Sequence, residues 1–222
     1  MVFELYERAK KTREALKSLG IYDQVERLTR DLVGELEGYW ESVAKPLGKL
    51  EGMSKYFLDK PDTFRLREMS GEFLEILLNT FISLRSDYSV ASHEFMRTVF
   101  LGHFSMGLNF MSMICGINVS KLREIATKRI DKSQHISNFY NAVEQAIKGL
   151  YANSDTLDRV VSLIEEINYT MREADLDMPW DMRDVYSAVF RLSRIERDIL
   201  LVLEELRDTL NNYFRSYVME PY

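Results

Sequence analysis

The segment that most constrains the fold is 87–116, which reads DYSVASHEFMRTVFLGHFSMGLNFMSMICG. After Arg97, no formally charged residue occurs until Lys121. The large apolar side chains recur at helical spacing, and they are Phe95, Val99, Phe104, Leu108, Met111 and Cys115. A helix that is apolar nearly all round is normally buried on several sides. The segment therefore predicts the central helix of a bundle.

The same segment does not predict a membrane span. A span needs about 20 predominantly apolar residues, and here His103, Asn109, serines and glycines interrupt the run. Insertion into a bilayer is penalised residue by residue for such groups. Residues 1–19 are charged throughout and show no signal-peptide pattern. We expect a soluble, cytoplasmic protein, and the single Cys115 fits a reducing compartment.

Composition and periodicity indicate the fold class. A chain of 222 residues can bury a sizeable core, and a single domain, 1–222, is the default expectation. Four prolines and ten glycines are present, and no strand-like alternation bounded by turn residues occurs. Long runs of 3.6-residue periodicity predict an all-α fold. The formal net charge of −6 argues against binding to nucleic acid by overall charge, but it leaves room for a local basic surface.

Turn residues divide the periodic runs. Helices are predicted over 2–19, 22–43, from 62, from about 120, and over 133–151, 154–173 and 180–217. Gly20 suits the end of the first helix because glycine tolerates a positive φ. Lys45 and Pro46 are expected to stop the second, since the residue before proline avoids helical geometry. Ser154 is expected to cap the helix that follows it.

Two stretches carry a family resemblance. They are HEFMRTVFLGHF, residues 93–104, and DVYSAVFRLSRIE, residues 184–196. Together they resemble the translin family, with its translin and translin-associated factor X branches. Agreement with the factor X branch lies at Glu94, Phe95, His103 and Phe104. Agreement with the translin branch lies at Arg97, Val99, Phe100, Leu101 and Phe104.

The resemblance implies a fold, a partner and a chemistry. Members of this family are antiparallel bundles of about seven helices that assemble, typically as octamers, around a cavity for single-stranded RNA or DNA. The catalytic branch cuts RNA with a small carboxylate cluster that binds a divalent metal. Several carboxylates are needed because Mg²⁺ takes oxygen ligands and then activates water beside a phosphate. The resemblance thus implies a homo-oligomer, up to an octamer, with single-stranded nucleic acid as its partner.

The carboxylate cluster of the family is incomplete in this sequence. Its first glutamate is kept as Glu94, but the second position, three residues on, is Arg97. Asn138 and Gln145 stand where the family has aspartates, and Glu144 offers partial compensation. A single carboxylate beside an arginine favours an ion pair over Mg²⁺ binding. We therefore expect a non-catalytic member without a cofactor.

Two alternatives to this expectation stay open. One is a metal-dependent endoribonuclease of the factor X type, with Glu94 as the catalytic residue and Mg²⁺ as its cofactor. The other is a helical scaffold or adaptor without a nucleic-acid role, which the acidic net charge favours.

Residues within the central segment also have competing interpretations. Glu94 and Arg97 lie at i,i+3 and can pair structurally, while Arg97 is also a candidate nucleic-acid contact. His103, on an otherwise apolar helix, is interpreted as a hydrogen-bonded core residue. Arg97 and His103 also match the loose Arg-x5-His spacing of HEPN-type ribonucleases, which chance easily produces.

The most basic window predicts a phosphate-binding surface. Its candidate residues are Lys121, Arg123, Lys128 and Arg129, and the basic residues of 2–19 come second. Phosphate contacts by lysine and arginine supply sequence-independent affinity; the alternative is a solvated helix face. Four aspartates, Asp175, Asp177, Asp181 and Asp184, look like a metal cluster. Acidic residues at a helix start are favoured by the helix dipole, which accounts for most of them.

Overall fold

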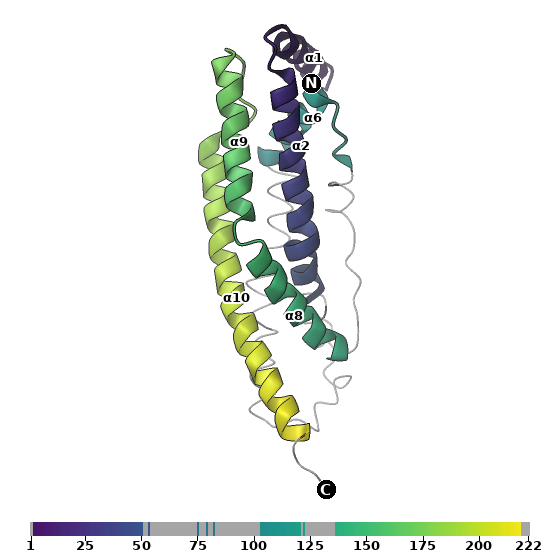
Figure 1. Cartoon of the computed structure of the whole chain (residues 1–222), viewed down its shortest axis with the longest axis vertical. Coiled ribbons are helices and arrows are strands. Elements are labelled where there is room, and N and C mark those ends of the chain that lie inside the picture. Colours follow the sequence, from purple (N-terminus) through teal and green to yellow (C-terminus); the bar gives the residue numbers. More distant parts are fainter. Residues whose placement is uncertain are drawn as a thin grey trace. The chain divides into compact units, whose positions relative to one another are not determined.

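The computed structural model describes residues 2–50, 53, 75, 79, 82, 103–120, 122 and 136–218 (Figure 1). Every regular element within these residues is a helix. They are α1 (Val2–Ser18), α2 (Tyr22–Tyr39), the π-helix η1 (Trp40–Ala44), α6 (His103–Cys115), α8 (Ile136–Ala152), α9 (Thr156–Glu173) and α10 (Met182–Val218). The predicted all-α class is confirmed. The number of about seven helices stays a prediction, because it concerns the whole chain.

The contacts divide the chain into two compact units. The first comprises Met1–Trp40, Glu94–Lys128 and Asp155–Arg191, and the second comprises Glu41–His93, Arg129–Ser154 and Leu192–Tyr222. Helix α10 supplies residues to both. No helix in the described ranges is long and apolar enough to cross a membrane.

The first unit is built on the apolar stripe of α2. This helix packs against α9 and α6, and α1 packs against α6; α2 and α9 run side by side in Figure 1. The buried residues of the α2 stripe are Val25, Leu28, Leu32, Leu36 and Tyr39. In α6, the predicted stripe residues Phe104, Leu108, Met111 and Cys115 are buried as well. The five residues of the α2 stripe recur at helical spacing within 22–43, so the periodicity predicts the buried faces of α2 and α6 correctly.

Two glycines end helices of this unit. Gly20 follows α1 with φ 73°, and Gly116 follows α6 with φ 68°. The amide of Ile21 donates to Leu16 O at 3.1 Å, and that of Ile117 donates to Ser112 O at 3.1 Å. These are six-to-one bonds of the kind that close a helix C-terminus through a left-handed residue. The expectation for Gly20 is confirmed.

The prediction that the second helix ends at Lys45 and Pro46 is wrong. Helix α2 continues into the π-helix η1, and residues 45–50 are α-helical again. Lys45 and Pro46 therefore do not end the helix. Proline lacks the N–H that would bond the carbonyl four residues back, which is Ser42 O. That carbonyl lies against Gly149 of α8, where a Cβ atom would collide with it. The wider π turn that precedes Pro46 accommodates the proline.

Helices α8 and α10 supply further core to the second unit. The buried side chains of α8 are Ala142, Val143, Ala146, Ile147 and Leu150. The buried positions of α10 in this unit are Leu192, Ile199, Leu203, Leu206 and Leu210. Apolar residues of 180–217 recur at steps of three and four, which predicts a buried seam through these positions; Ile195 of the same series is only half-buried. The Tyr140 hydroxyl donates to Asn211 Oδ1 at 2.8 Å, joining the two helices.

Candidate functional site

The site residues chosen from the sequence lie outside the described part of the chain. They are Glu94, Arg97, Lys121, Arg123, Lys128 and Arg129. His103 is the first residue of α6. Their roles stay predictions.

The described residues of the first unit contain an open pocket of about 690 Å³. It lies where α1, the end of α9, the α9–α10 loop and the start of α10 meet. Its lining residues are Arg8, Arg172, Asp177, Met178, Pro179, Trp180, Asp181, Met182 and Arg183. Three arginines and two aspartates thus line one pocket.

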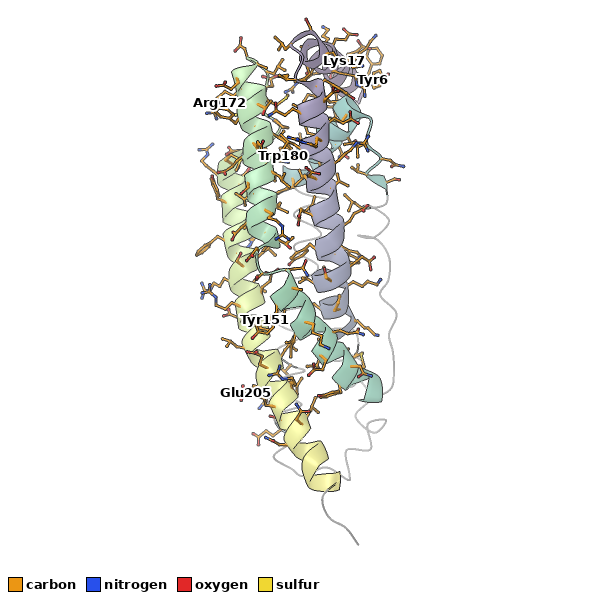
Figure 2. All side chains as sticks on the ribbon, in the orientation of Figure 1. Tyr6, Lys17, Tyr151, Arg172, Trp180 and Glu205 are labelled. Carbon is orange, nitrogen blue, oxygen red and sulfur yellow. The ribbon has the colours of Figure 1, made fainter. Side chains whose placement is uncertain are left out.

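The α9–α10 loop is held in place by its own turn and by Trp180. Asp175, with φ 56°, follows α9, and the Leu176 amide donates to Met171 O at 2.9 Å. Trp180 is 5 % exposed, and its Nε1–H donates to Phe104 O of α6 at 3.3 Å. This indole anchors the loop against α6 and gives the pocket a fixed wall (Trp180 is labelled in Figure 2).

Two further residues keep Trp180 in position. Asn168 of α9, 3 % exposed, donates its Nδ2–H to Trp180 O at 2.9 Å. Gly107 of α6 leaves room for the loop, because a Cβ atom there would lie 2.7 Å from Pro179 O and would also collide with the indole. The close packing of the loop on α6 therefore requires glycine at this position.

Two of the three arginines are paired with carboxylates. Arg8 Nη2 lies 2.8 Å from Asp177 Oδ2, and its guanidinium carbon lies 5.0 Å from the Phe110 ring centroid. Arg183 Nη2 lies 2.8 Å from Asp181 Oδ2. Hydrogen bonds from the side chain and main chain of Arg183 lower the pKa of the Asp181 carboxyl. Both pairs are exposed to solvent.

The third arginine has a weaker partner. Arg172, labelled in Figure 2, lies in the last turn of α9. It donates to the Met178 thioether at 3.2 Å. Among the described residues, no carboxylate pairs with it. Sulfur of a thioether is a weak acceptor. Three guanidinium groups against two carboxylates leave one formal positive charge in the pocket, and Arg172 carries it.

The four aspartates of this region have separate structural tasks. Asp175 forms the left-handed turn after α9. Asp177 pairs with Arg8, and Asp181 caps α10 by accepting the Arg183 main-chain N–H at 2.9 Å. Asp184 lies in the first turn of α10. Across the described ranges, no group of three or more histidine, cysteine or acidic side chains is placed to hold a metal ion.

Two helix boundaries near the site differ from those predicted. Asp181 stands before the first residue of α10, Met182, so the helix begins after the predicted start at Trp180. Asp155, and not Ser154, occupies the N-cap position of α9.

Three basic residues of α1 have neighbours of different kinds. Arg8 enters the pocket. Arg13 donates through Nε to Ile114 O and through Nη2 to Met113 O, at 2.6 Å for the latter, which satisfies carbonyls at the end of α6. Lys17 Nζ lies 5.0 Å from the Tyr22 ring centroid. Lys10 and Lys11 are exposed, and the nucleic-acid role of α1 stays a prediction.

Sequence reasoning missed Arg172 and Arg183. They stand on either side of the loop EADLDMPWD, in the last turn of α9 and the first turn of α10. A basic residue close to each end of one short loop was the available signal. It did not indicate that Arg8, more than 150 residues earlier, would join them.

A scan against models of known protein families, a search of curated proteins and a search of solved structures find no match to this chain. The fold and the site define it as an all-α protein with an arginine-lined pocket.

Proposed function

We propose that this chain is a translin-like protein that binds single-stranded RNA or DNA, acts as a homo-oligomer and lacks an intact nuclease site. The observation that carries the proposal is the pocket that Arg8, Arg172 and Arg183 line. The resemblance of 93–104 and 184–196 to the translin family supports the same function, and the second of these stretches begins one residue after Arg183.

Arginine suits this task for physical reasons. Its planar guanidinium presents five N–H donors and binds phosphate oxygens in pairs. Such charge-assisted bonds are about twice as strong as neutral ones. These bonds do not depend on base identity, so binding is expected to tolerate any sequence. It should weaken as the salt concentration rises, because binding releases counterions from the phosphates.

The first test is a gel assay with a labelled single-stranded RNA of about 25 nucleotides, which spans more than one typical site. The protein is titrated with and without Mg²⁺. We expect a retarded, uncut band under both conditions. An unshifted and intact band at low salt would contradict the proposal and favour the scaffold alternative.

The assay also tests the nuclease alternative. Metal-dependent shortening of the RNA that disappears in Glu94→Ala would mean that Glu94 has carboxylate partners elsewhere and that the site is active. Shortening that persists in Glu94→Ala would exclude Glu94 as the catalytic residue.

A matched pair of variants tests the pocket itself. Arg172→Gln removes the guanidinium that lacks a carboxylate partner in the described chain, while Arg27→Gln removes an exposed arginine of α2 outside the pocket. We expect Arg172→Gln to lower the affinity about tenfold, as the loss of one charge-assisted contact does. It should also reduce the slope of log affinity against log salt by about 0.7. Equal effects of the two variants would locate binding away from the pocket.

A further inference from the structure

We infer that the Arg8–Arg172–Arg183 pocket takes the terminal phosphate of a single strand in preference to its internal phosphodiesters. This inference rests on the function proposed above and names the part of the ligand that this site recognises. It follows from the number of guanidinium groups, from their present partners and from the rigidity of the pocket wall.

Three arginines line the pocket, as many as a phosphate that is esterified once has free oxygens. They come from α1, α9 and α10 and line a single depression. A phosphomonoester offers three strong acceptor oxygens and carries a charge of about −1.5 to −2 at pH 7. A phosphodiester has two unesterified oxygens, one negative charge and a sugar on each side. The terminal group therefore presents more acceptors to the same donors.

The present carboxylate partners favour the more highly charged ligand. In the Arg8–Asp177 pair the side chains are 52 % and 75 % exposed, and in the Arg183–Asp181 pair they are 91 % and 45 % exposed. Exposed ion pairs contribute little to stability, so an incoming anion can replace the carboxylate at modest cost. A dianion gains more from this exchange than the monoanion of a diester, which carries the same charge as the aspartate that it displaces.

The recognition comes from side chains rather than from the helix end. Asp181 already caps α10 by accepting the Arg183 main-chain N–H. Arg172, by contrast, is held only by the Met178 thioether among the described residues. It is the donor that an anion can engage without displacing a carboxylate, and it should therefore dominate the selectivity.

The wall of the pocket is already fixed before a ligand binds. Trp180 is tied to α6 through Phe104 O and to α9 through Asn168. Met178 and Pro179 add apolar surface beside it, against which the terminal sugar can lie. A site that is organised in advance loses little conformational entropy on binding.

The experiment compares one RNA of about 25 nucleotides with a 5′-phosphate, with a 3′-phosphate and with hydroxyl groups at both ends. Affinities are measured with the full chain at one moderate salt concentration. We expect one phosphorylated form to bind about tenfold more tightly than the hydroxyl form. Arg172→Gln should abolish this preference, and Arg27→Gln should retain it. Circular dichroism verifies that both variants are folded.

A third variant, Asp177→Asn, should bind the phosphorylated RNA more tightly than the unmodified protein does. Asp177→Asn removes the carboxylate that competes for Arg8, and it should raise the affinity for the phosphorylated form about threefold. The hydroxyl form should change less.

The outcomes separate the two proposals. Equal affinity for all three RNAs would overturn the terminal-phosphate inference and leave single-strand binding intact. A preference that persists in Arg172→Gln would overturn the assignment to this pocket. Absence of binding by every form would overturn the proposed function, and the inference with it.

Discussion

Three helical arginines of the first unit have different roles, and the role of each depends on the groups that surround it. Arg13, half-buried, donates to the last carbonyls of α6 and so serves the fold. Arg8, five residues earlier, shares its guanidinium between Asp177 and the Phe110 ring. Arg172 faces the pocket with a thioether as its partner. Residue type alone would have assigned all three to a solvated or phosphate-binding face.

The buried thiol of Cys115 leads to a prediction about a single residue, namely its rate of chemical labelling. Burial raises the pKa of its thiol, and the hydrogen bond to Thr29 Oγ1 offsets this only in part. A raised pKa reduces the thiolate fraction near neutral pH, and the thiolate is the reactive form. We expect maleimide labelling at pH 7.5 to be on the order of 100-fold slower in the native protein than in urea, because it requires opening of the structure.

Mass spectrometry during the labelling reaction measures both rates. The chain contains one cysteine, so the modified mass reports Cys115 alone. Labelling at similar rates with and without urea would contradict the buried position of Cys115.

At the scale of elements, close helix contacts in both units depend on glycines, because glycine has no Cβ atom. Gly107 lets the α9–α10 loop and Trp180 lie against α6, and Gly149 lets α8 approach the carbonyl of Ser42. Gly34, on the exposed face of α2, has open space around it. The same residue type is therefore required in two helices and merely tolerated in a third.

The contrast predicts opposite effects of one substitution. Gly107→Ala should lower the free energy of unfolding by about 1–3 kcal/mol, because the new methyl group overpacks the loop. Gly34→Ala should raise it by about 0.5–1 kcal/mol, since alanine loses less backbone entropy in a helix. Urea unfolding followed by circular dichroism measures both. A neutral or stabilising Gly107→Ala would mean that the loop does not lie against α6 as described.

At the scale of the whole molecule, the assembly state is the property that separates a translin-like protein from a scaffold. The resemblance predicts a homo-oligomer. In the first unit, Phe3, Met106 and Phe190 are each 75 % exposed in the single chain. Association that covers such side chains removes apolar surface from water, which is the main driving force for subunit contacts.

Light scattering coupled to size-exclusion chromatography tests this expectation. The chain mass is 26.1 kDa, and we expect a native mass of several chains, up to eight. The mass should remain multimeric on dilution to micromolar concentration. A single species at the mass of one chain would contradict the homo-oligomer and weaken the family resemblance.

Local signals in the sequence determined most of the helices and their buried faces. Periodicity predicted the stripes of α2, α6 and α10, and Gly20 predicted the end of α1. These features depend on contacts within a few residues and on the φ angles that single residues allow. The helix across Pro46 was missed because a π turn, which periodicity does not reveal, precedes the proline and lets the helix continue.

Only the tertiary structure decided which charged residues form the pocket. Arg8 and Arg172 are separated by more than 160 residues and become neighbours through the packing of α1 on α6 and the anchoring of the loop by Trp180. The sequence alone determined that this chain is helical and where its charges stand along each helix. Charged residues that are distant in sequence come together only when the buried faces of several helices pack against one another. That packing depends on side-chain shape in many helices, whereas sequence spacing describes one helix at a time.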